Sequence, residues 1–141
     1  MRLRTSLVAL MVALLPAGCG GSHKTPPVSG RITLEGKPLA NAMVSFVPVA
    51  PVGDKNRPPS SVGITDADGR YSLVLNGDPE TTGAMVGKHK VMITLGAQGA
   101  SNDTKPTFHK QLPQRYNRRT ELECDVPDDG RNDADFDLKW K

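Results

Sequence analysis

The chain has 141 residues, the length of one ordinary domain, and its 37% hydrophobic content is enough for a packed core. Its 14 glycines and 12 prolines interrupt long helices, so short strands joined by turns are expected. The formal net charge is +3 and falls to about +1 when Arg2 and Arg4 are removed with residues 1–18. That balance is too weak for the concentrated basic face of a nucleic-acid-binding protein.

Residues 1–18 have the order of a secretory signal peptide. Arg2 and Arg4 form a positive segment, an unbroken apolar run follows from Leu7 to Leu15, and small residues precede Cys19. The apolar run is too short for a transmembrane helix, which needs about 20 residues. The alternative is a buried N-terminal helix, which would not normally carry two arginines before residues that are apolar all round. We therefore predict export across a membrane.

The segment Leu15-Pro16-Ala17-Gly18-Cys19 resembles the lipobox of bacterial lipoproteins, with proline at the position where leucine is usual. The resemblance implies cleavage before Cys19, acylation of that cysteine, and a membrane as partner. Several acyl chains on one residue hold a protein stably at a membrane. Gly20 is not the aspartate that typically signals inner-membrane retention, so an outer-membrane location is implied. Residues 19–27 are then a flexible linker, and residues 28–141 are the folded domain.

The second cysteine, Cys124, lies on the apolar side of an alternating segment. We expect it to be a small buried hydrophobic residue, because no nearby histidine or cation in the sequence would activate its thiol. The competing interpretation is a Cys19–Cys124 disulfide in a secreted protein that carries no lipid.

From Val28 onward, apolar and polar residues alternate with a period of two, which is typical of half-buried strands. The alternation predicts strands over 28–34, 42–47, 71–75, 88–95, 121–126 and 135–140, with a further strand beginning at Val62 and Ile64. Turns are expected at 35–38, 66–69 and 76–79, and prolines mark a long loop over 48–59. The predicted fold class is all-β, an antiparallel β-sandwich of about seven strands.

Three motifs in order carry a family resemblance: VSGRIT, GKPL and AMVSF within residues 28–46, TDADGRYSL at 65–73, and GKHKVMI at 87–93. They resemble carboxypeptidase regulatory-like domains over about Val28 to Leu95 and, more loosely, the last strand. The resemblance implies a transthyretin-like β-sandwich that is accessory rather than catalytic. Small lipoproteins made of this domain alone look similar, including an LPxxYN stretch at residues 112–117.

Metal-binding patterns are weak in this sequence. Asp66 and Asp68 suggest a calcium loop, but Gly69 comes too early and no distal glutamate follows, so a plain hairpin turn is favoured. His23, His89 and His109 are not spaced as ligands on one element. We expect His89 to pack with the apolar face of its strand, and we expect no metal or other cofactor.

The stretch from Gly96 to Arg119 is long for a loop in a compact domain, and such loops are usually functional or disordered. It is rich in basic and aromatic residues that suit an anionic polymer or a protein partner. The residues that form this possible partner-binding loop are Lys105, His109, Lys110, Arg115, Tyr116, Arg118 and Arg119. The alternative is that these cations only neutralise the acidic strands that follow.

The sequence favours a lipid-anchored binding or structural module of the cell envelope without catalytic activity, which contacts a protein or polysaccharide. One alternative is a glycan-acting enzyme that uses carboxylates of the C-terminal strands, such as Asp133 or Asp135. Another is a solute-binding lipoprotein that serves a transporter, although the chain is short for a two-lobed clamp.

Overall fold

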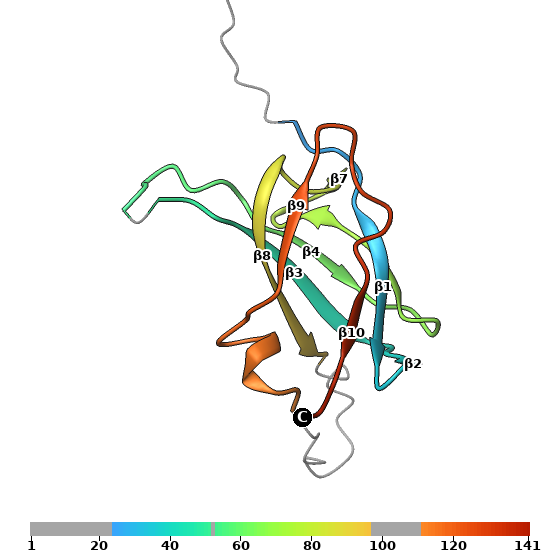
Figure 1. Cartoon of the computed structure of the whole chain (residues 1–141). Helices are drawn as coiled ribbons and strands as arrows, with labels where there is room; N and C mark the ends of the chain where they lie inside the picture. The colour runs from blue at the N-terminus through green and yellow to red at the C-terminus, as the bar shows by residue number, and fades with distance from the viewer. Residues whose placement is uncertain (1–23, 52, 97–110) are drawn as a thin grey trace, which may run out of the picture.

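The computed structural model describes residues 24–51, 53–96 and 111–141, and these residues form an all-β sandwich (Figure 1). The strands are β1 (Ser29–Leu34), β2 (Lys37–Pro38), β3 (Ala42–Pro48), β4 (Ser61–Ile64), β5 (Arg70–Ser72), β6 (Val74–Leu75), β7 (Asp78–Thr82), β8 (Gly87–Leu95), β9 (Glu123–Val126) and β10 (Phe136–Leu138). A single 3-10 turn, η1 (Gln114–Tyr116), precedes β9. The predicted fold class is confirmed. No helix in the described part of the chain is long and apolar enough to cross a membrane.

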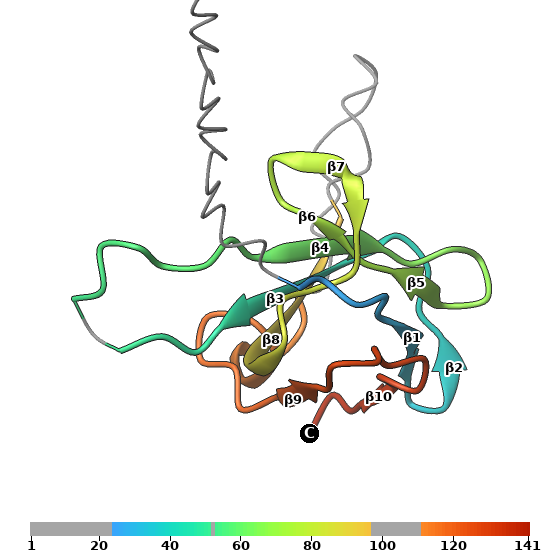
Figure 2. The same cartoon turned by 90° about the horizontal axis from the view of Figure 1, so that it is seen from above.

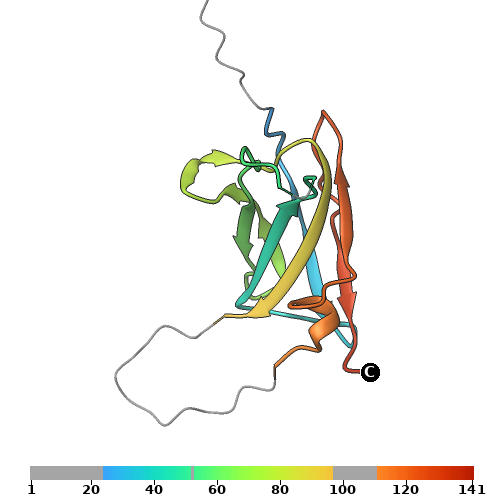
Figure 3. The same cartoon turned by 90° about the vertical axis from the view of Figure 1, so that its left-hand side faces the viewer.

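The larger sheet has six strands in the order β7-β6-β4-β3-β8-β9, and all its neighbours are antiparallel. Its longest pairing joins β3 to β8, from Ala42 opposite Leu95 to Pro48 opposite His89. In Figure 3, the long strand β8 curves as it runs between β3 and β9. This curvature is the normal consequence of strand twist.

The smaller sheet is built around β1, which pairs with β2 and β5 in antiparallel fashion and with β10 in parallel. The parallel pair departs from the antiparallel sandwich that the sequence predicts. Ile32 stands opposite Phe136, about a hundred positions later in the chain, so no tight turn sets the direction of β10. The segment between β9 and β10 carries the chain from the larger sheet to the smaller one (Figure 2).

The core lies between the two sheets. Alternate positions of β3, β8 and β9 are buried, as the period-two pattern predicts. The cluster is centred on residues that share this inward face: Ile32, Val44, Phe46, Leu73, Val91, Ile93, Cys124, Val126 and Leu138. The sequence pattern thus located most of the buried surface correctly.

The strand expected to begin at Val62 and Ile64 forms as β4, but these two apolar residues are not its buried ones. Ser61 and Gly63 are buried, whereas Ile64 is 70% exposed. The register explains the inversion, because Gly63 stands opposite the core residue Val44 and therefore shares its face. A Cβ atom at Gly63 would lie 2.5 Å from the carbonyl oxygen of Ser72, so the close approach of the next strand requires glycine.

The turn at 66–69 forms, but it does not make a hairpin of paired strands. The Asp66 N–H donates to the carbonyl of Arg70, and the Gly69 N–H donates to the carbonyl of Asp66. Its two strands then separate, since β4 pairs with β6 in the larger sheet and β5 pairs with β1 in the smaller one. The turn therefore connects the two layers.

The predicted strand over 71–75 is split at Leu73. The N–H of Leu73 donates to the carbonyl of Val28, and its side chain is buried where the chain passes between the sheets. The turn expected at 76–79 is shorter, because β7 already begins at Asp78. Pro79 fits there because β7 is an edge strand, where a missing N–H breaks no ladder.

Candidate functional site

The predicted partner-binding residues fall into two groups. Lys105, His109 and Lys110 lie outside the residues that the structure describes. The remaining four residues lie in η1 or directly after it: Arg115, Tyr116, Arg118 and Arg119. Only these four can be judged from the fold.

Arg115 and Tyr116 are held in internal contacts. The Arg115 Nη2 donates to the carbonyl oxygen of Lys139 over 2.7 Å, and the guanidinium lies 4.9 Å from the centroid of the Tyr116 ring. Tyr116 is buried, and its hydroxyl accepts the N–H of Lys139 over 2.9 Å. These two side chains therefore fasten η1 to the C-terminal segment.

Arg118 and Arg119 are exposed. Their backbone N–H groups are fixed, one to the Asn117 side chain over 2.6 Å and the other to the carbonyl of Gln114 over 2.9 Å. Within residues 24–51, 53–96 and 111–141, neither guanidinium has a hydrogen-bond or ion-pair partner. Figure 1 shows η1 at the end of the sandwich opposite the point where the described chain begins. The backbone thus presents two free cations from a fixed position.

Two acidic residues of the C-terminal segment pair with cations of that same segment. Asp133 pairs with Arg131 over 2.9 Å, and Asp137 pairs with Lys139 over 2.7 Å. None of the ion pairs in the described residues joins these carboxylates to Arg115, Arg118 or Arg119, so ion pairing with the acidic strands does not account for these three arginines.

Asp137 also connects two strands. Its carboxylate accepts the Thr33 hydroxyl over 2.7 Å and the Gly36 N–H over 3.2 Å. The hydrogen bond from Lys139, followed by that from Thr33, lowers the pKa of Asp137 to about 2. This carboxylate stabilises the β1–β10 pair.

The calcium alternative at Asp66 is not supported by the geometry of the turn. The Asp66 Oδ1 accepts the N–H groups of Asp68 and Arg70, each over 2.9 Å, which is the usual way an aspartate stabilises a turn. In the parts of the chain that the structure describes, no three histidine, cysteine or acidic side chains gather to hold a metal ion.

Cys124 and His89 are buried, as predicted, and they stand opposite each other on β9 and β8. Burial raises the pKa of the Cys124 thiol, which disfavours the reactive thiolate. Burial also lowers the pKa of His89, whose Nδ1 lies 2.8 Å from the carbonyl oxygen of Gly87. Both residues pack in the core. The alternative disulfide involves Cys19, which is outside the described residues.

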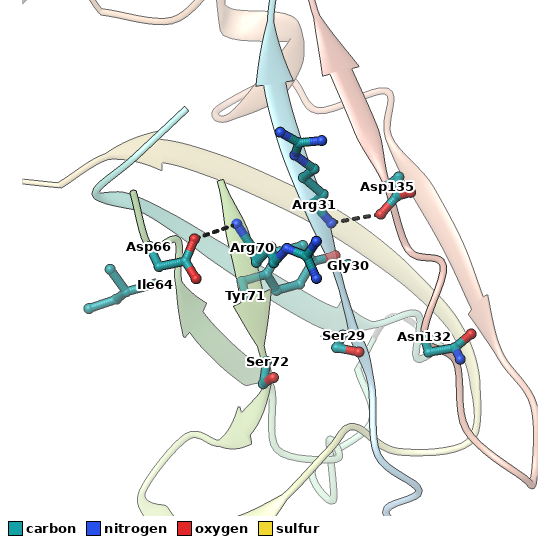
Figure 4. Close-up of a pocket in the computed structure, with 10 residues that line it drawn as sticks. All are labelled: Ser29, Gly30, Arg31, Ile64, Asp66, Arg70, Tyr71, Ser72, Asn132 and Asp135. Carbon is teal, nitrogen blue, oxygen red and sulfur yellow. Dashed lines mark hydrogen bonds between the residues drawn. The ribbon is translucent and has the colours of Figure 1, made fainter. Parts of the chain in front are cut away.

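An open polar pocket of about 550 Å³ was not predicted from the sequence. It lies against β1 and β5, between the end of β4 and the segment before β10 (Figure 4). Its lining is mostly polar and consists of Ser29, Gly30, Arg31, Ile64, Asp66, Arg70, Tyr71, Ser72, Asn132 and Asp135.

Two arginines stand opposite each other in this pocket, because Arg31 of β1 is the register partner of Arg70 of β5. The Arg31 Nε donates to the carbonyl of Asp68 over 2.9 Å, and its backbone N–H donates to Asp135 Oδ1 over 2.7 Å. The Arg70 guanidinium has no hydrogen-bond or ion-pair partner among the described residues. The pocket therefore holds one anchored and one free guanidinium.

The pocket depends on contacts between distant parts of the chain. A Cβ atom at Gly30 would lie 2.1 Å from the carbonyl oxygen of Ala134, so glycine allows the segment before β10 to approach β1. The same carbonyl accepts the Tyr71 hydroxyl over 2.6 Å. In the sequence, the signal for this pocket is an arginine at a polar position of each strand, Arg31 in β1 and Arg70 in β5. Such a position does not reveal which strand lies opposite.

No family model matches the chain, and no curated protein or solved structure matches it. The resemblances to bacterial lipoproteins and to carboxypeptidase regulatory-like domains therefore rest on the sequence motifs and remain predictions. The β-sandwich agrees with the fold that the second resemblance implies, but a fold does not fix a function.

Proposed function

We propose that the protein is a lipid-anchored binding module of the cell envelope, tethered through Cys19 and without catalytic activity. The signal-like residues 1–18 and the lipobox-like segment before Cys19 support the anchor. The observation that carries the binding role is the placement of Arg118 and Arg119. They are exposed and unpaired within the described residues, and they directly follow η1, which lies at the end of the sandwich away from where the described chain begins (Figure 1).

This placement suits contact with an acidic surface of a protein or polysaccharide in the envelope. Arg115 and Tyr116 fix the segment, so little backbone freedom is lost when the neighbouring arginines bind. Arginine presents a planar set of donors that matches carboxylate and phosphate groups. A tether at one end of the domain leaves such a surface facing away from the membrane.

A glycan-acting enzyme is the second candidate, and one observation favours it. Asp66 and Asp135 line the same pocket, as a pair of acid and base groups would. However, each already accepts backbone N–H groups that shape the pocket wall. We prefer binding because these contacts give both carboxylates a structural role.

The test is cross-linking in intact cells that produce the full chain, with an affinity tag inserted after Asn56 in the exposed connection between β3 and β4. We expect the wild-type protein to fractionate with membranes and to recover defined envelope partners. The Cys19→Ser variant should move to the soluble fraction. The Arg118→Ser/Arg119→Ser variant should stay with membranes and recover at least about tenfold less partner, because charge-assisted contacts are lost.

The matched control is Lys37→Ser/Lys88→Ser, which removes the same charge from two other exposed positions. It should recover partners as the wild type does. Equal losses in both double variants would reject Arg118 and Arg119 as the contact. Membrane retention of Cys19→Ser would reject the lipid anchor. Hydrolysis of envelope polysaccharide that disappears in Asp135→Asn would establish the enzyme instead.

A further inference from the structure

The arginine pair in the pocket places two like charges on neighbouring strands. Arg31 and Arg70 are direct cross-strand partners, and like charges in that position repel each other. Arg31 is restrained by its bond to the carbonyl of Asp68, so it is not free to swing away. An anion bound between the two guanidinium groups would offset this repulsion.

The free hydrogen-bonding groups indicate where the anion would bind. Arg70 has no side-chain partner within the described part of the chain, and the two terminal nitrogens of Arg31 have none either. Figure 4 shows both side chains at the pocket, on adjacent strands. A carboxylate accepts hydrogen bonds from guanidinium groups in the plane of its two oxygens, which matches a pair of neighbouring arginines.

The remaining lining selects among anions. Asp66 and Asp135 place two negative charges on the same walls, which disfavours a small ion that carries more than one negative charge. Carboxylate oxygens accept hydrogen bonds from hydroxyl groups, and Asn132, Ser29 and Ser72 add amide and hydroxyl groups that donate and accept. This mixture suits a ligand with many hydroxyls and one negative group on each unit.

We propose that the pocket binds a saccharide unit that carries a carboxylate, a sugar acid. The carboxylate binds between Arg31 and Arg70, and the ring hydroxyls bond to Asn132, Asp135 and the serine hydroxyls. The exposed side chain of Ile64 supplies an apolar surface at the rim for the C–H face of the ring. This site shares no residue with the Arg118–Arg119 contact, so it stands independently of the proposed partner surface.

The experiment is calorimetric titration of the full chain in detergent micelles with a trisaccharide of galacturonic acid. The same trisaccharide with its carboxylates methyl-esterified is the matched neutral ligand, and inorganic phosphate is the matched simple anion. We expect saturable binding of the acid that weakens with salt, at least about tenfold weaker binding of the ester, and no comparable binding of phosphate.

Arg70→Gln is the decisive variant, because its guanidinium supports nothing in the described fold. It should weaken binding at least about tenfold and leave the unfolding transition unchanged or raised, since the repulsion with Arg31 is gone. Asn132→Ala should also weaken binding, because the hydrogen bonds from the Asn132 amide to the ring hydroxyls are lost. Arg57→Gln, an exposed arginine outside the pocket, should bind as the wild type does.

Four results would overturn the proposal. Equal affinity for acid and ester would remove the role of the carboxylate, and phosphate that binds as tightly as the saccharide would leave only a general anion site. Absence of saturable binding would reject the pocket as a sugar-acid site. Unchanged binding by both Arg70→Gln and Asn132→Ala would reject it as well. Partner recovery by the Arg118 and Arg119 variants is measured separately, and its result does not change the interpretation of the saccharide titration.

Discussion

Buried polar side chains of the core bond mostly to nearby backbone groups. The Tyr71 hydroxyl donates to the carbonyl of Ala134, and the Thr65 hydroxyl accepts the N–H of Ala42 over 2.9 Å. Burial raises the pKa of Tyr71 far above its ordinary range, so the phenol stays neutral and keeps its donor. Ser61 and His89 are the exceptions, since the Ser61 Oγ and the His89 Nε2 are buried without a partner among the described residues.

At the residue scale, we predict that His89 makes folding sensitive to mild acid. Burial, the largest effect, holds its pKa below the ordinary value of 6.5, although the Gly87 carbonyl opposes the shift. Below pH 6.5 the unfolded chain therefore takes up a proton that the folded chain does not. The free energy of unfolding should fall as pH decreases through this range, by at most about 1.4 kcal/mol per pH unit.

Urea denaturation at a series of pH values measures this effect, with His89→Phe as the comparison. Phenylalanine keeps an aromatic ring beside Phe46, whose ring centroid is 5.7 Å from that of His89, and has no proton to bind. The difference in slope between the two proteins isolates His89 from the other histidines. Parallel curves for the two proteins would show that His89 titrates equally in both states.

At the scale of elements, β1 organises the smaller sheet because it pairs with β2, β5 and β10. Its parallel partner β10 comes from the far end of the chain and cannot be aligned by a turn. Side chains supply the alignment instead. Asp137 stands opposite Thr33 and accepts its hydroxyl, and it also accepts the N–H of Gly36 in the turn after β1.

We therefore predict that Asp137 contributes stability that disappears in strong acid. Its pKa falls from the ordinary 3.8 to about 2 in the folded protein, chiefly through the hydrogen bond from Lys139. The contribution is complete above pH 3.8 and is lost as pH falls through the folded pKa, because both states are then protonated. Asp137→Asn should unfold at lower urea than the wild type at neutral pH.

The difference between Asp137→Asn and the wild type should shrink as pH falls from 3.8 toward 2. Added salt should weaken only the part due to Lys139, because both side chains of that pair are exposed. A difference that stays constant across this pH range would mean that the carboxylate charge does not align β10 with β1.

At the scale of the whole molecule, the residues expected to belong to a flexible linker contact the domain. The carbonyl of Pro26 accepts the N–H of Ala84 over 3.2 Å, and the carbonyl of Pro27 accepts the N–H of Arg131 over 2.9 Å. Gly83 passes so close that a Cβ atom there would lie 2.0 Å from the Pro26 oxygen. The ordered contacts thus begin before Val28.

We predict that a chain shortened to begin at Lys24 is more stable than one that begins at Val28. Loss of the two carbonyl acceptors should lower the free energy of unfolding by about 1 to 3 kcal/mol, since a backbone hydrogen bond contributes about 0.5 to 1.5 kcal/mol. Urea denaturation of the two proteins gives the difference. Equal midpoints and slopes would place the start of the cooperative domain at Val28.

The sequence alone determined the all-β class and most of the buried faces, because burial of one side of a strand forces a period of two. It also placed Cys124 and His89 in the core. These features are local, since a residue's neighbours at two-residue spacing reveal which side of the strand faces inward.

Only the tertiary structure decided the rest. The phase of β4, the parallel pairing of β10 and the meeting of Arg31 with Arg70 all depend on which strands become neighbours. It likewise separated Arg115 and Tyr116, which hold the C-terminal segment, from the exposed Arg118 and Arg119. Local alternation of polar and apolar residues does not show which strand, tens of residues away, becomes a neighbour. The pairing of strands is decided when the two sheets pack together.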